Sequence, residues 1–222
     1  KNIELSRQIT AQEAKLSEQQ KNKIEVSNLL SILIEQIAFE ARESELVVAK
    51  SGVSARLTIS AFENLVSAAE LRMLLKKKEN TFVRITDLTG VIPAVNGKIE
   101  LVYEGEQEGA AMVAEMLLGK AIRNHFIKLL PDPVKLKRKK EHNPYEPILN
   151  WFGKGNMVDF LVDASEKQYK QELDSIPGLG DLVNNHLPKL NKNDKYVMME
   201  FVLHALSEHS QISKNVIQQG FQ

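Results

Sequence analysis

Apolar residues recur at helical spacing along most of this chain, and that periodicity limits the possible folds more than any other feature. Between residues 26 and 41 they stand three and four positions apart, as on one face of an amphipathic helix. Further helices are predicted from Ser60, where Ser60 and Glu63 have capping-box spacing, over 108–130, and from about Asn193. The sequence therefore predicts an all-α fold. The apolar positions of the first helix are Val26, Leu29, Leu30, Leu33 and Ile37.

One segment alternates as a strand would. Ile99, Leu101 and Tyr103 alternate with Lys98, Glu100 and Val102, which is the period of a half-buried strand. We expect at most this one short strand, paired with something outside the chain. A short helix is predicted around Thr86 and Asp87, with Pro93 kinking or ending it. Other short helices are predicted over 147–152, 158–162, 165–175 and 179–186, and in the tail 211–222.

The composition is typical of soluble globular proteins. Hydrophobic residues make up 43% and charged residues 26%, and 29 basic residues balance 29 acidic ones. Nothing in this balance favours nucleic acid as a partner. No apolar run has the length of a membrane span, and the first residues are polar, so we expect no membrane partner. The chain has no cysteine, which excludes thiolate metal sites and agrees with a cytoplasmic location.

Several catalytic motifs are missing from the sequence. The chain has three Gly-Lys pairs, at Gly97, Gly119 and Gly153, but none has the earlier glycine or the following Ser or Thr of a Walker A loop. No Asp-Glu pair ends a Walker B strand. His204 and His209 stand five apart, a poor spacing for two metal ligands on one helix face. We therefore expect no catalytic residue, no metal site and no ATP hydrolysis in this chain alone.

The segment Ser51–Ala69, with its Gly-Val-Ser-Ala-Arg run, resembles a turn in MoxR-like and magnesium-chelatase-like AAA+ ATPases. In that family the Gly-x-Ser-x-Arg turn opens a helix of the helical lid. Ile85–Val95 is similar to the next lid helix, and Gly97–Gly105 to the segment that closes the lid. Residues 26–41 stand where the first lid helix belongs. These landmarks follow one another in the family's order over about residues 25–105.

The resemblance implies that Arg56 is the sensor 2 arginine of such a lid. A guanidinium is always charged and makes forked contacts to phosphate, so it suits this role. The implied parent is a bacterial ring-forming ATPase that uses ATP and magnesium to remodel or chaperone a client protein. Because the chain opens on Lys1 and carries no nucleotide-binding motif, we expect it to be the C-terminal part of that polypeptide, without the core.

Three regions follow from these patterns. Residues 1–24 are predicted to be a leader helix or linker, 25–105 an AAA+ lid-like helical domain, and 106–222 an appended helical region. A linker is predicted near 131–147. Its composition favours a break, because prolines end the long helix and a basic run follows.

Alternative interpretations of these residues, without a specific function, stay open. Arg56 has the alternative of a solvated loop arginine. The basic run Lys135–Lys140 suits a solvated linker, or contact with nucleic acid or an acidic partner. The acidic positions Glu104, Glu106 and Glu108 suit a solvated turn, or a cation. For the whole chain the alternative function is a stand-alone helical interaction module that binds a protein or nucleic acid.

Overall fold

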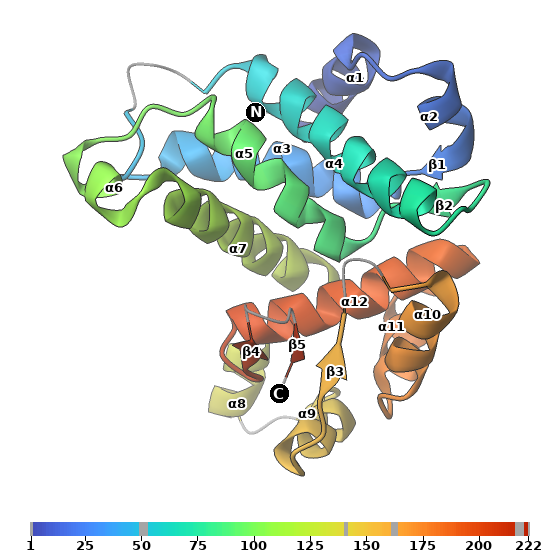
Figure 1. The fold of residues 1–222 in the computed structure, drawn as a ribbon. Helices are drawn as coiled ribbons and strands as arrows, with labels where there is room; N and C mark the ends of the chain where they lie inside the picture. Colours follow the sequence, from blue (N-terminus) through green and yellow to red (C-terminus); the bar gives the residue numbers. More distant parts are fainter. Residues whose placement is uncertain (1, 49–52, 140–141, 161–163, 216–219, 222) are drawn as a thin grey trace. The chain divides into compact units, whose positions relative to one another are not determined.

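A computed structural model describes residues 2–48, 53–139, 142–160, 164–215 and 220–221 (Figure 1). Within these ranges the chain forms twelve α-helices and one 3-10 helix, and each of the strands is two residues long. The predicted all-α class is confirmed. The chain divides into two compact units, Lys1–Ala121 and Ile122–Gln222, which are described in turn.

The first unit begins with four helices. They are α1 (Ile3–Glu13), α2 (Glu18–Lys23), α3 (Asn28–Glu43) and α4 (Ala55–Leu75). Asn2, Ser17 and Ser27 accept hydrogen bonds from the first turns of α1, α2 and α3, so the start of each helix is capped. Helix α1 packs against both α3 and α4. The N-terminal residues are therefore part of the packed unit.

The predicted start of α4 at Ser60 is wrong. The helix begins at Ala55, because Leu57, Ala61 and Leu65 form one fully buried face that starts before Ser60. Ser60 lies inside the helix, where no free N–H is left to cap. Its supposed capping partner Glu63 instead accepts the backbone N–H of Lys15 at 2.8 Å.

Short elements complete the first unit. Strand β1 (Ile24–Glu25) pairs in parallel with β2 (Thr81–Phe82), and the 3-10 helix η1 (Ile85–Val91) leads into α5 (Ile92–Asn96). Pro93 falls in the first turn of α5, where its missing N–H is not needed. The short helix predicted around Thr86 and Asp87 is present as η1, and it ends at Val91, before Pro93, as predicted.

The strand-like segment 98–103 also differs from its prediction. Among the described residues it makes one antiparallel bridge, between Leu101 and Val47, and it then turns into α6 (Tyr103–Glu108). Two backbone hydrogen bonds flank the bridge, from Val48 N to Glu100 O at 2.8 Å and from Val102 N to Leu46 O at 3.1 Å. Its partner is thus this chain's own loop after α3, and the expectation of an outside partner is wrong.

Helix α7 (Ala110–Leu129) passes from the first unit into the second. The second unit continues with α8 (Pro133–Lys139), α9 (Glu146–Gly153), α10 (Glu166–Asp174), α11 (Leu179–His186) and α12 (Lys192–Glu208). Strands β3 (Val158–Asp159), β5 (Gly220–Phe221) and β4 (Lys214–Asn215) pair antiparallel in that order. The helices predicted over 158–162 and 211–222 are therefore wrong where residues are described; 161–163 and 216–219 lie outside the described residues.

Helix α12 forms the centre of the second unit. Its ten consecutive residues 197–206 are all buried, as expected for a helix surrounded by other elements. The Phe126 ring lies 6.0 Å from Phe201 and 5.8 Å from Tyr145. Tyr145, inside the predicted linker, is fully buried, and its hydroxyl donates to the carbonyl of Pro131. This part of residues 131–147 is thus packed into the second unit.

Candidate functional site

Arg56 lies on the first turn of α4 and is exposed. Among the described residues, no hydrogen bond or ion pair engages its guanidinium. Ser54, the residue at the helix cap, makes no side-chain capping hydrogen bond, while the Leu57 N–H donates to the Ser54 carbonyl at 3.0 Å. Gly52, which begins the Gly-x-Ser-x-Arg pattern, and Ser51 before it lie outside the described residues. The site combines a cation with the positive end of a long helix.

The chain entering α4 is held by the end of α3. Arg42 donates from Nε and Nη2 to the carbonyl of Val53, at 3.1 and 3.0 Å. The Arg42 guanidinium also lies over the Phe39 ring, 5.3 Å from its centroid. Val53 and Leu57 are buried on either side of Arg56. The backbone at Arg56 is therefore anchored, while its side chain extends into solvent.

A buried polar cluster lies beneath this turn. The carboxylate of Glu35, 1% exposed, accepts hydrogen bonds from the hydroxyls of Ser6 and Thr10. The Thr10 hydroxyl is also 2.8 Å from that of Thr58, on the first turn of α4. Buried polar groups require such partners. The cluster therefore ties α1 and α3 to the part of α4 that carries Arg56.

Sequence reasoning missed this cluster. Its members are far apart in the chain, and only one local signal was present. Glu35 stands three positions from both Ile32 and Ala38, spacing that shares one helix face, and a carboxylate among apolar residues needs a polar partner. That signal predicts a partner but does not name Ser6 or Thr10.

The far end of α4 carries a buried ion pair that sequence reasoning also missed. Arg72 Nη2 donates to Asp87 Oδ2 at 2.8 Å, and the two side chains are 4% and 1% exposed. Asp87 belongs to η1, which packs along α4. Both ends of α4 are thus attached to neighbouring elements by buried polar contacts.

The other predicted candidates do not come together. No group of three or more potential ligands in the described residues is arranged to hold a metal ion. Glu104, Glu106 and Glu108 are exposed on α6. His204 Nε2 lies 3.8 Å from Glu200 Oε1 inside the second unit, while the His209 ring packs 5.7 Å from the Phe126 ring.

Two further features concern charge. Burial, helped by Lys128, lowers the pKa of His125 to about 4. The basic run lies mostly on α8, where Lys135, Lys137 and Arg138 are exposed; Lys140 lies outside the described residues.

No helix in the described part of the chain has both the length and the apolar character needed to cross a membrane.

Comparisons of the chain with protein-family models, with curated proteins and with solved structures found no match. The hypothesis that residues 25–105 form a lid with Arg56 as its sensor therefore depends on the ordered resemblance and on the local geometry.

Proposed function

We propose that this chain is the C-terminal part of an AAA+ ATPase of the MoxR or magnesium-chelatase type. Residues 25–105 serve as its nucleotide-responsive lid, and Arg56 serves as its sensor. The observation that carries the proposal is the exposed guanidinium of Arg56 on the anchored first turn of a 21-residue helix. An arginine in such a position can bind a phosphate without breaking a hydrogen bond or ion pair that stabilises the fold.

The chemistry of the site suits a phosphate group. A guanidinium offers a planar fork of donors to phosphate oxygens, and the start of a long helix adds the positive end of its dipole. The core of the same polypeptide binds ATP and magnesium and carries the hydrolytic residues. When the γ-phosphate leaves, Arg56 loses part of its contact, and α4 moves with it.

The remaining roles follow from the same proposal. The parent forms a homo-oligomeric ring in the cytoplasm, and residues 106–222 contact a client protein that the ATP cycle remodels or chaperones. A stand-alone helical interaction module is the second candidate, favoured by the exposed leucines at the end of α4. The coding sequence upstream of Lys1 distinguishes the two, since only the ATPase requires a Walker A and a Walker B motif there.

The direct test is Arg56→Ala in the full-length parent. We expect ATP turnover to fall by roughly a hundredfold or more, while the free energy of unfolding changes by no more than about 0.5 kcal/mol, as for an exposed side chain. Arg56→Lys should recover little, because lysine lacks the fork. Arg138→Ala, which removes an exposed arginine from α8, is the matched control and should leave turnover unchanged.

Two results would contradict the proposal. One is normal turnover in a folded Arg56→Ala parent. The other is ATP hydrolysis by this chain alone that scales with its concentration and survives Arg56→Ala, because the activity would then arise from residues outside the proposed site.

A further inference from the structure

Three leucines on the last turns of α4 are exposed. Leu71, Leu74 and Leu75 are 59%, 56% and 64% exposed, and their spacing places them on one face of the helix. We call these three residues the leucine knob. Lys77 and Lys78, also exposed, follow it directly. A contiguous apolar surface with a charged rim is typical of an interaction site.

A groove of matching character lies elsewhere in the first unit. It has a volume of about 390 Å³ and lies between the end of α3, the loop that follows, and α7. The partly exposed Leu46 and the 44% exposed Met116 supply its accessible apolar surface, while Val113 and Leu117, which also line it, are buried. The exposed Glu43 and Glu45 stand on its rim. We call this the acidic groove.

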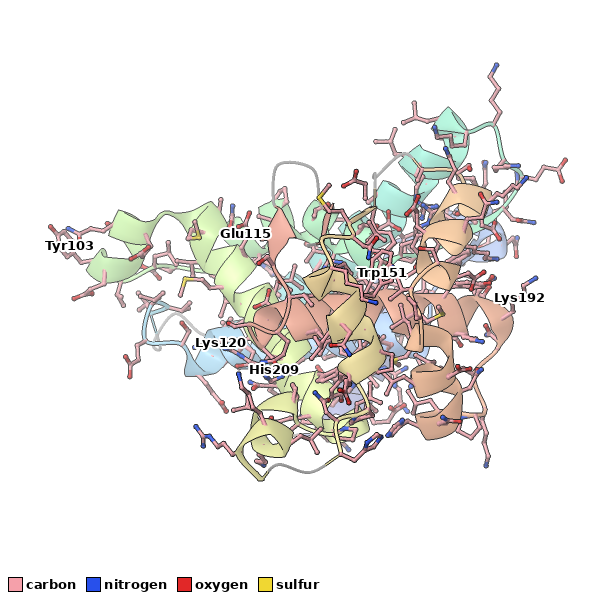
Figure 2. All side chains as sticks on the ribbon, turned by 90° about the horizontal axis from the view of Figure 1, so that it is seen from below. Tyr103, Glu115, Lys120, Trp151, Lys192 and His209 are labelled. Carbon is pink, nitrogen blue, oxygen red and sulfur yellow. The ribbon has the colours of Figure 1, made fainter. Side chains whose placement is uncertain are left out.

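One basic residue also lines the acidic groove. Lys120 of α7 stands at its edge, beside the end of α3 (Figure 2). The two carboxylates of Glu43 and Glu45 outnumber this single ammonium, so the rim keeps a net negative charge.

The leucine knob cannot reach the acidic groove of its own chain. The hydrogen bonds from Arg42 to Val53 hold the end of α3, and hence the groove, beside the start of α4. The knob is at the other end of this 21-residue helix, about 30 Å away at the helical rise. Figure 1 shows the end of α4 beside β2, with α6 and the start of α7 at the opposite side of the first unit.

We propose that the leucine knob of one copy of this chain docks in the acidic groove of a second copy. Leucines at i, i+3 and i+4 are the anchors by which a helix enters an apolar groove. Lys77 and Lys78 then face Glu43 and Glu45, so the charges of the two rims are complementary. Because the knob and the groove are different surfaces, the contact is head-to-tail, and a docked pair still offers one free knob and one free groove. The contact needs no nucleotide and does not depend on the role of Arg56.

Cysteine cross-linking tests the geometry directly. The chain has no cysteine, so Leu75→Cys and Met116→Cys each introduce a single thiol. A disulfide forms only where two Cα atoms approach within about 7 Å. We expect mild oxidation of the two variants mixed together to give a covalent dimer, in several-fold higher yield than either variant alone. Leu5→Cys, 55% exposed on α1 and outside both surfaces, replaces Leu75→Cys in the control and should give only background.

Sedimentation over a concentration series tests the contact without cross-links. Leu75→Glu and Met116→Glu should each raise the apparent dissociation constant of self-association by about tenfold or more, while Leu5→Glu should match the unmodified chain. An equal mixture of Leu75→Glu and Met116→Glu should form dimers that do not grow, since one intact knob and one intact groove remain per pair. Circular dichroism checks that each variant is folded.

Charge reversal gives a second route to the same answer. Lys77→Glu with Lys78→Glu should weaken association, and Glu43→Lys with Glu45→Lys in the other copy should restore it. The proposal is overturned if the unmodified chain stays monomeric throughout the series, if the mixed glutamate variants do not associate, or if the cysteine mixture gives no more dimer than the Leu5→Cys control. Capture of another protein by the knob alone would leave the groove variants without effect, and would overturn it too.

Discussion

Removal of the Asp87 carboxylate should destabilise the first unit strongly, because it leaves a buried guanidinium without its counter-ion. Arg72 donates to Asp87 at 2.8 Å, and also to Thr81 Oγ1 and to the carbonyl of Phe82, each at 2.9 Å. Asp87 Oδ2 also accepts the backbone N–H of Arg84 at 2.7 Å. The pair therefore connects α4 to β2 and η1.

The magnitude follows from what each substitution leaves unpaired. Breaking a buried ion pair from one side costs about 3–5 kcal/mol, and Asp87→Ala also leaves the Arg84 N–H without an acceptor. We expect a loss of about 4 kcal/mol, a large part of the 5–15 kcal/mol that typically holds a domain folded. Asp87→Asn keeps an oxygen that can accept from both Arg72 and the Arg84 N–H, so its loss in the free energy of unfolding should be about half as large. Arg72→Met with Asp87→Leu removes both charges, so its loss should be smaller than the sum of the two single losses.

The assay uses the position of the only tryptophan. Trp151 belongs to α9 of the second unit, so its fluorescence reports on that unit, while far-UV circular dichroism reports on both. In urea titrations, Asp87→Ala should shift the dichroism transition to lower denaturant and affect the fluorescence transition less. The reasoning is refuted if Asp87→Ala unfolds within about 0.5 kcal/mol of the unmodified chain, or if the single losses simply add in the double variant.

Three shorter predictions concern stability. Gly105→Ala should cost roughly 2 kcal/mol in a urea titration, since its Cβ would stand 2.5 Å from the carbonyl oxygen of Leu46. Lys77→Gly should increase the free energy of unfolding by up to about 1 kcal/mol and raise the melting temperature slightly, because Lys77 follows α4 with a left-handed φ of 51°. The second unit should lose up to about 3 kcal/mol as pH falls from 6.5 toward 4, since only the unfolded chain protonates His125 there; His125→Leu should remove that slope, and an unchanged slope would show that other groups cause it.

The longer helices could be predicted because their information is local. Helices α3, α7 and α12 each repeat apolar residues at helical spacing, and each formed within a few residues of its predicted range. The two-residue strands could not be predicted, since a segment that short shows no alternation. Among the described residues, the strand-like run before α6 makes a single bridge, between Leu101 and Val47.

The candidate site was predictable only in part. The Gly-x-Ser-x-Arg pattern singled out Arg56, and the resemblance implied that a helix opens at that turn. The contacts that anchor the turn were not predictable, because Thr10 and Thr58 stand 48 positions apart in the sequence. The ion pair between Arg72 and Asp87 was not predictable either, since in the sequence each residue alone resembles an ordinary surface charge.

The two proposals meet on one helix, and their combination makes a last prediction. Arg56 and the leucine knob lie at opposite ends of α4, about 30 Å apart. The Thr10–Thr58 contact and the Arg72–Asp87 pair attach both ends of α4 to its neighbours, so a displacement at one end is carried to the other by a packed, rigid element.

If both proposals hold, nucleotide bound in the parent should change the affinity between copies, and Arg56→Ala should remove that nucleotide effect while leaving the association of this chain alone unchanged. Sedimentation of the parent with ADP and with a non-hydrolysable ATP analogue measures the coupling, which for allosteric sites is commonly about 5-fold to 150-fold. Association that responds equally to both nucleotides in the unmodified parent and in Arg56→Ala would show that α4 does not carry the signal, even if each of its ends has the role proposed for it.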